Sequence, residues 1–268
     1  MNCISNKYIK TSKVNITTLN KYGKTILDDI YFTAPFKVSP PFYKEDNSIK
    51  VIVMSSSAGI MAGDIHEYNI TIQDNTNIEI TSQSYEKIHK MEEGEAHRKC
   101  NIFVGSNSLL EYKPLPTIPF KDSAFNSNMN ITLKDKSSRL ILIDIISCGR
   151  VAFGENFEYK YYKSYTEVKC CDRLVYVDNT IYDPYIIDLN NFGMFEGYTH
   201  LANLLICNFD DPIEKLNLIR DIIENDKEIN GGATLTQSKD ISIKIFGYSA
   251  QKLTYISEEI IRIFENIC

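Results

Sequence analysis

The sequence lacks the long apolar runs that mark secretion or membrane insertion. Its opening segment, MNCISNKYIK, contains no continuous apolar core of a secretory signal. The most apolar stretch, Leu140 to Ile146, is interrupted by Asp144, and it is far shorter than the roughly 20 apolar residues that a membrane-spanning helix needs. We therefore expect a cytoplasmic protein with no membrane segment, in which the N-x-T triplets at Asn15, Asn69 and Asn130 arise by chance.

An excess of positive charge is also missing. Lys and Arg number 29 against 35 Asp and Glu, so the formal net charge is −6. A surface that holds nucleic acid needs dense Lys and Arg to neutralise phosphates, so nucleic acid is not an expected partner. The 43% share of hydrophobic residues excludes a disordered regulator, and 268 residues are enough for one large all-β domain.

The familiar motifs for metal and nucleotide sites are absent as well. The 7 cysteines include no C-x-x-C pair, so we expect mostly reduced core thiols rather than disulfides or structural zinc. The 4 histidines are scattered, without an H-E-x-x-H or H-x-H arrangement. The segment Gly59 to Asp64 lacks the Lys and Ser or Thr of a phosphate-binding loop, so nucleotide binding is not predicted.

What the sequence does contain is alternation of apolar and polar residues from Lys10 to about Val177, for example in IHEYNITI at 65–72. Turn clusters separate these short runs, and no helical pattern lies between them. The pattern predicts a mainly β fold of stacked, antiparallel-rich sheets, β-helix-like or sandwich-like in arrangement. Four segments of the form N-I-T or N-I-F, at positions 15, 69, 101 and 130, are too unevenly spaced to predict a solenoid repeat.

The last third predicts two C-terminal α-helices. Asp211 and Pro212 precede apolar residues at helical spacing and predict a helix over 212–225. Ser249 can cap a second helix, whose apolar stripe runs from Leu253 to Ile267. A strand is predicted at 241–246. With no linker rich in Gly, Pro or Ser, we expect one domain over 1–268, strand-rich over 10–180 and helix-containing over 200–268.

Asp144 is the most unusual residue of the strand-rich part. In LILIDII at 140–146, Asp144 shares a face with Leu140, Leu142 and Ile146, while the other face is wholly isoleucine. Asp144 is therefore predicted to be largely buried. Because an isolated buried carboxylate is costly, it must be paired, hydrogen-bonded, protonated, or in contact with a wet cavity or a metal ion. A carboxylate that accepts backbone N–H groups at a bulge would satisfy the same pattern.

Other polar residues have the same character. Asp64 and His66 lie two apart at a strand start and could offer two ligands to a divalent metal on one face, although a surface pair explains them equally. Asp178 ends an apolar run and also fits a turn. Ser82 and Ser84 turn the apolar face of their strand polar. Several strands thus carry polar groups inward.

We expect no enzymatic activity. A nucleophile triad of Cys148, His200 and Asp178 can be written down, but no local signature accompanies these residues. A Cys-dependent hydrolase built on Cys148 is the enzyme alternative, and a thiol that is unreactive at neutral pH would exclude it.

Several ordered blocks resemble the urease accessory protein family UreD, also called UreH. They are PFKV at 35–38 with Pro41-Phe42, SAGIMAGD at 57–64, TSQS at 81–84, LEY at 110–112, PLPTIPF at 114–120 and DIISCGRVAFGE at 144–155. Weaker similarity continues to the C-terminal helices. The family has paired glycines where this chain has Ala58-Gly59 and Ala62-Gly63, which leaves only Gly59 and Gly63 for left-handed turns.

The resemblance implies a non-enzymatic maturation factor for the nickel enzyme urease. Such proteins bind UreF, recruit the GTPase UreG and dock on the urease apoprotein, and their interior is proposed to pass nickel in transit without a tightly bound cofactor. By position, the resemblance carries over as path-lining groups Asp64, Thr81, Ser84, Asp144 and Asp178. A transit path needs few and weak oxygen ligands, since three His or Cys ligands would trap the ion.

A pure adaptor without metal conduction is the alternative role. The partner-binding surface would then be the proline-punctuated segment Pro116, Thr117, Ile118, Pro119 and Phe120, a preformed docking edge. Nearby, Arg150 and Glu155 bracket a glycine-containing corner, where a salt bridge is expected.

Overall fold

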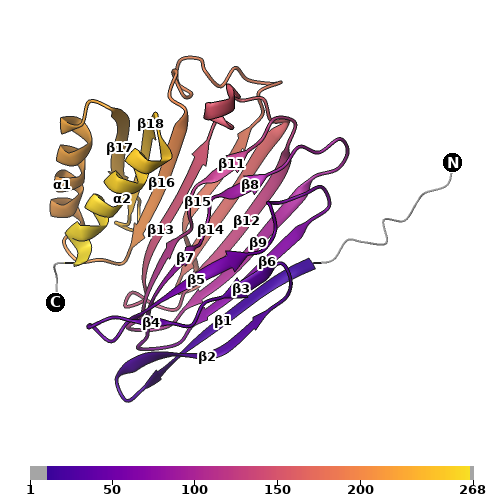
Figure 1. Ribbon diagram of the computed structural model, residues 1–268. Coiled ribbons are helices and arrows are strands. Elements are labelled where there is room, and N and C mark those ends of the chain that lie inside the picture. The colour runs from indigo at the N-terminus through magenta and orange to yellow at the C-terminus, as the bar shows by residue number, and fades with distance from the viewer. Residues whose placement is uncertain (1–10, 266–268) are drawn as a thin grey trace.

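The structure, a computed structural model, describes residues 11–265 and contains two β-sheets that lie face to face (Figure 1). In spatial order, the first sheet consists of β15 (Arg173–Tyr182), β14 (Tyr161–Cys170), β12 (Ala124–Leu133), β9 (Ala96–Val104), β6 (Ile65–Ile72), β1 (Thr11–Lys21) and β2 (Lys24–Phe32). The second runs β17 (Ile229–Leu235), β18 (Ile241–Gly247), β16 (His200–Cys207), β13 (Arg139–Ser147), β10 (Leu109–Lys113), β7 (Asn77–Ser82), β5 (Ile49–Ser55) and β3 (Phe36–Val38). The short strands β4 (Phe42–Tyr43), β8 (Glu86–Ile88) and β11 (Thr117–Pro119) pair beside this path.

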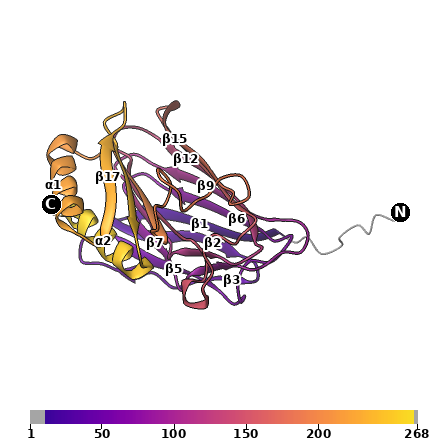
Figure 2. The same cartoon turned by 90° about the horizontal axis from the view of Figure 1, so that it is seen from above.

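The chain winds between the two sheets. It passes from β6 to β7, from β9 to β10 and from β12 to β13, and each return places a new strand parallel to the previous one. The turns Asp74-Asn75 and Gly105 to Asn107 therefore join strands of different sheets and not neighbours of one hairpin. The result resembles a flattened coil, with the two layers visible from above (Figure 2).

The predicted mainly β class with two C-terminal helices is confirmed, but the pairing differs from the antiparallel-rich expectation. The wound strands pair in parallel, and antiparallel pairs lie toward the outside, as in β1–β2 and β14–β15. Parallel neighbours need a crossover, usually a helix; here the crossover is a strand of the opposite sheet. Alternation of residue types indicates that one face of a strand is buried and leaves the direction of its neighbour open.

An asparagine ladder crosses the outer face of the first sheet. Asn15, Asn69, Asn101 and Asn130 stand in register on four adjacent strands. The amide of Asn69 donates to Asn15 Oδ1 at 3.1 Å, Asn101 to Asn69 at 3.1 Å and Asn130 to Asn101 at 3.4 Å. These are the four N-I-T or N-I-F segments. Their separations of 54, 32 and 29 residues are uneven because the intervening excursions differ in length.

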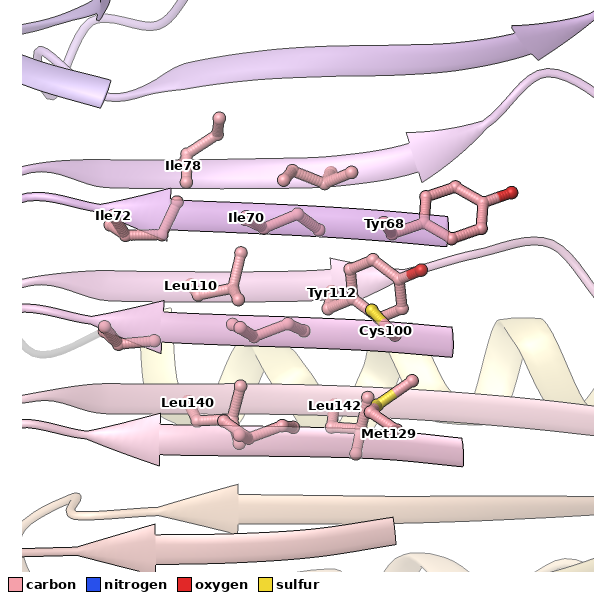
Figure 3. Packing of buried hydrophobic residues seen from close by; sticks show 14 of the residues in the cluster. Tyr68, Ile70, Ile72, Ile78, Cys100, Leu110, Tyr112, Met129, Leu140 and Leu142 are labelled. Carbon is pink, nitrogen blue, oxygen red and sulfur yellow. The ribbon is translucent and has the colours of Figure 1, made fainter. Parts of the chain in front are cut away.

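An apolar core fills one end of the space between the sheets. Ile70 and Ile72 of β6 face Ile78, Leu110 and Leu140 of the opposite sheet (Figure 3). A second core lies between the outer face of the second sheet and the helices, and it includes the isoleucines of β13 that alternate with the inward residues. The second sheet is thus covered on both faces, as the LILIDII pattern predicts.

Both predicted helices form, as α1 (Pro212–Asn225) and α2 (Ala250–Glu265), and a short 3-10 helix, η1 (Val151–Phe153), lies between β13 and β14. The backbone N–H of Lys252 donates to Ser249 Oγ at 3.2 Å, as expected of a cap, whereas the side chain of Asp211 makes no capping bond. Ile267 lies outside the described residues. No helix in the described range 11–265 is long and apolar enough to cross a membrane.

The ladder predicts a graded loss of stability. Asn101→Ala removes two side-chain hydrogen bonds and should lower the free energy of unfolding by about 1 kcal/mol, because an exposed amide bond contributes little net energy. Asn15→Ala removes one and should cost about half of that value. Urea unfolding of both variants checks the ranking, and equal effects would contradict a shared ladder.

Candidate functional site

Polar side chains form a row across the inner face of the first sheet, next to the apolar core between the sheets. The paired residues of this interior row are Ser12, His66, Arg98, Ser127, Ser164 and Thr180, one from each of β1, β6, β9, β12, β14 and β15. The neighbouring Tyr68 of β6 and Tyr112 of β10 point their hydroxyls away from the isoleucines (Figure 3). The interior is therefore polar along this row, and a further apolar cluster that includes Phe125 and Tyr182 lies beyond it.

Arg98 is the centre of this row. Only 7% of its surface is exposed. Its Nη1 donates to Glu86 Oε2 of β8 at 2.6 Å, its Nε to Ser127 Oγ at 3.1 Å and its Nη2 to the Tyr162 hydroxyl at 3.4 Å. Burial opposes the charged form of Arg98, but the carboxylate of Glu86 outweighs burial and raises the pKa of Arg98. Arg98 is therefore a fixed, buried positive charge that links both sheets.

A first cavity of about 170 Å³ lies on one side of Arg98, with room for several water molecules. Its buried side is formed by His66, Tyr68, Arg98 and Tyr112. The exposed residues Ser57, Ser84 and Lys87 lie at its mouth, and Thr81 and Ser82 also line it.

A second cavity of about 30 Å³ lies on the other side of Arg98, with space for one or two water molecules. Asp144, Asp178, Tyr162 and Asn203 line it. Because Arg98 lines the first cavity, Tyr162 lines the second, and the two are hydrogen-bonded, this pair separates the cavities.

The two aspartates of the second cavity differ in their surroundings. Asp178 pairs with Lys244 at 2.7 Å and accepts from Thr180 Oγ1 at 2.5 Å. Burial raises the pKa of Asp178, but these partners outweigh burial and lower it below the usual value. The carboxylate of Asp144 has no hydrogen-bond donor within the described part of the chain, and burial raises its pKa.

Of the alternatives predicted for Asp144, the structure shows contact with a cavity. The side chain is half-buried and lines the small second cavity, and among the described residues it forms neither a salt bridge nor a hydrogen bond at a bulge. Its neighbour across the strand pair, Asn203, also has an unpartnered oxygen in this cavity. Water or a cation could satisfy both groups.

Asp64 lies apart from the interior row. Its Oδ2 accepts the backbone N–H of Met61 at 2.8 Å in a turn where Gly63 has φ +84°. His66 instead lies inward in the wall of the first cavity. The predicted Asp64–His66 pair is therefore divided between a surface turn and the interior. No group of three or more His, Cys, Asp or Glu residues within 11–265 is arranged to hold a metal ion.

The segment from Pro116 to Phe120 is built into the second sheet. Thr117 pairs with Ile146 of β13 on one side and Glu86 of β8 on the other, so this strand has no free edge. Pro116, Thr117 and Pro119 are buried, whereas Ile118 and Phe120 are half-buried. Only these two side chains could contact a partner there.

Cys148 and His200, two residues of the conceivable nucleophile triad, are hydrogen-bonded within the fold. Cys148 is buried and donates to the Glu155 carbonyl at 3.7 Å, and burial raises the pKa of its thiol to about 11. His200 bonds with Thr199 Oγ1 at 2.8 Å, and burial lowers the pKa of His200 to about 4. A thiol that stays protonated at neutral pH is a poor nucleophile. The expected salt bridge between Arg150 and Glu155 is confirmed.

The other free cysteines agree with the expectation of core thiols. Cys100, Cys170 and Cys207 are buried, and Cys171 is exposed. Cys3 and Cys268 lie outside the described residues.

A second charged cluster joins α2 to the outer face of the second sheet. Glu79 pairs with Lys44 and Lys50 at 2.8 Å each and with Lys113 at 3.5 Å, and Lys113 reaches Glu258 of α2 at 3.5 Å. Burial raises the pKa of Glu79, but the lysines outweigh burial and lower it to about 2. This cluster stabilises the fold and lies outside both cavities.

Comparison with known proteins identifies the family. The family model described as UreD urease accessory protein matches residues 10–267. A Urease accessory protein UreH from Helicobacter pylori strain G27 is 36% identical over 259 residues, 96% of each chain. A Urease accessory protein UreD from Acetivibrio thermocellus is 34% identical over 98% of this chain and 99% of its own.

These matches make the chain one of the urease accessory proteins. Within that class it belongs to the UreD family, whose fold has here a wound pair of mixed sheets and two C-terminal helices.

The different surroundings of the two interior aspartates predict opposite effects on stability. Asp144→Asn should raise the free energy of unfolding at pH 7 by about 1 kcal/mol, because burial of this charge outweighs the attraction of the nearby Arg98. Asp178→Asn should lower it by about 1–2 kcal/mol, because Lys244 loses its counter-ion. Thermal and urea unfolding measure both, and a destabilised Asp144→Asn protein would contradict the unpartnered carboxylate.

The Glu79 cluster predicts a pH dependence. The pKa of Glu79 is lower in the folded chain, so its stabilisation is complete above about pH 4.5 and is lost as the pH falls toward 2. Glu79→Gln should cost about 1–2 kcal/mol at pH 7, reduced by the partial exposure of its lysine partners. This difference should shrink in urea unfolding below pH 4, while Glu67→Gln, at the more exposed pair with Lys13, should show a smaller cost at pH 7.

Proposed function

We propose that this chain acts in urease maturation as the component that binds UreF, brings the GTPase UreG to the urease apoprotein and offers nickel an interior path. It has no catalytic role in this proposal, and nickel is its cargo rather than a resident cofactor. Membership of the UreD family supports a role in maturation. The ordered sequence blocks between residues 35 and 157, which resemble the family, support the partners.

One observation carries the proposed path. Asp144 is a carboxylate that faces a cavity and makes no ion pair among the described residues, although the nearby charge of Arg98 acts on it. The two carboxylates nearest to it have partners: Arg98 neutralises Glu86, and Lys244 neutralises Asp178. These groups together therefore have one negative charge in excess when Asp144 is ionised, and a cation entering the second cavity would balance it.

The chemistry of the row suits an ion that must leave again. Around Asp144 the available ligands are oxygen atoms: the carboxylate of Asp178, the amide oxygen of Asn203 and the hydroxyls of Thr166 and Thr180. Nickel prefers nitrogen and sulfur ligands, so an oxygen set holds it weakly. Multiple weak positions allow an ion to enter and to leave, as conduction requires.

The path predicts a separation of assembly from metal delivery. Asp144→Ala should reduce the nickel content and activity of co-expressed urease severalfold, because it removes a carboxylate that faces the second cavity and has no ion pair among residues 11–265, while UreF still co-purifies. The matched control is Glu67→Gln, which changes an outward carboxylate of β6 beside the inward His66. Loss of UreF from the purified complex would mean that Asp144 is structural.

A pure adaptor remains the second candidate, and one observation favours it. The guanidinium of Arg98 stands between the two cavities, and a fixed positive charge opposes the passage of a cation. Exposed apolar side chains that could meet partners occur at Phe153, Tyr185, Ile186 and Phe192. If Asp144→Ala leaves both assembly and nickel content unchanged, the adaptor role is supported and the path is rejected.

A further inference from the structure

Two side chains that line the first cavity, His66 and Glu86, are suited to bind a divalent cation, and the carboxylate of Glu86 already accepts from Arg98. The imidazole of His66 is only 4% exposed, lines this cavity, and its Nδ1 has no hydrogen-bond partner. Glu86 lines the same cavity and carries the carboxylate, but Arg98 holds that carboxylate at 2.6 Å. An unpartnered buried imidazole is unusual, since buried polar groups are nearly always hydrogen-bonded.

The protonation state of His66 leaves it able to bind a metal. Burial lowers the pKa of His66, so the ring is neutral at pH 7 and one nitrogen has a free lone pair. Imidazole together with carboxylate oxygen suits nickel and zinc better than calcium or magnesium. Hydroxyls of Thr81, Ser82 and Tyr68 line the same cavity, and its volume of about 170 Å³ leaves room for retained water molecules.

We propose that Glu86 and His66 form a latent divalent-cation site in the first cavity, and that Arg98 keeps it closed by occupying the Glu86 carboxylate. Arg98 and a cation at Glu86 oppose each other, because both are positive and compete for one carboxylate, whose Oε2 already accepts from Arg98 Nη1. A cation binds when the guanidinium leaves Glu86. The inference rests on the proposed function for the identity of the cation as nickel.

The anchoring of Arg98 shows how the site could open. Two of its three partners, Ser127 and Tyr162, are neutral hydroxyls of the first sheet, and only Glu86 is charged. Asp144 lies near enough for its charge to favour the guanidinium. After release from Glu86 the guanidinium of Arg98 still has the carboxylate of Asp144 nearby. Its buried positive charge is therefore not left without an opposite charge.

The test is nickel binding by calorimetry at pH 7 with the full-length chain and variants of Arg98. Arg98→Gln frees Glu86 and removes the repelling charge, so nickel affinity should rise at least tenfold over the wild type. Arg98→Lys keeps a positive charge beside Glu86 and should show no such gain. Glu86→Gln combined with Arg98→Gln, and His66→Phe combined with Arg98→Gln, should each abolish the gain.

Two results would overturn the proposal: a folded Arg98→Gln protein with wild-type affinity, or a gain that survives the loss of Glu86. If Arg98→Gln does not fold, Ser127→Ala takes its place, because it removes one anchor of Arg98 and leaves both charges; it should raise affinity at least twofold, and no rise overturns the site. Urease loading with Asp144→Ala tests the path separately, so either idea can fail while the other stands.

Discussion

Parallel pairing of β6, β9, β12 and β14 is the constraint on which the interior depends. In a parallel ladder, residues at equal positions of successive strands stack in rows, so one polar residue per strand becomes a continuous line. The same register that stacks His66, Arg98 and Ser127 on the inner face stacks the asparagines on the outer face. A shift of one residue in a single strand would exchange the two faces and would place the guanidinium of Arg98 in water.

The sequence predicts the elements better than their connections. The strand 65–72 and the helix 212–225 coincide with the observed bounds, because period-two and helical patterns depend on local burial. Parallel winding could not be predicted, since alternation contains no information on strand direction and the crossovers are strands rather than helices. The aligned asparagine segments are a sign of winding that their uneven spacing conceals.

Within the site, Asp144 is predictable and Arg98 is not. LILIDII is apolar on both faces, so its single carboxylate stands out. In AHRKCNIFV the residues on either side of Arg98 are also basic, so the alternation is difficult to recognise. The buried positions of this strand are Ala96, Arg98, Cys100, Ile102 and Val104. Its partner Glu86 lies in a strand of three residues, too short to show any period. A positively charged residue in phase with buried positions is the signal that would have revealed the row.

The charges of the interior explain how one row can serve two purposes. Arg98 joins the sheets through Glu86, Ser127 and Tyr162, so polar contacts stabilise this part of the interior together with apolar contacts such as the Phe125 ring, 5.6 Å from the guanidinium. Arg98 also lies between the two cavities, which differ in net charge. The first cavity is neutral, because Arg98 and Glu86 balance each other, whereas the second contains the carboxylate of Asp144, which has no ion pair among the described residues. Structural cohesion and control of access are therefore properties of a single side chain.

The antiparallel strands at the two borders of the first sheet have a further consequence. Both border pairs, β1–β2 and β14–β15, contain a bulge, after Thr17 and after Val168 respectively. A regular coil of parallel strands would otherwise end in flat, unsatisfied edges that invite the same segment of another molecule. At both borders the chain reverses direction and a bulge bends the strand. The parallel pairing therefore ends there and does not continue into a second molecule.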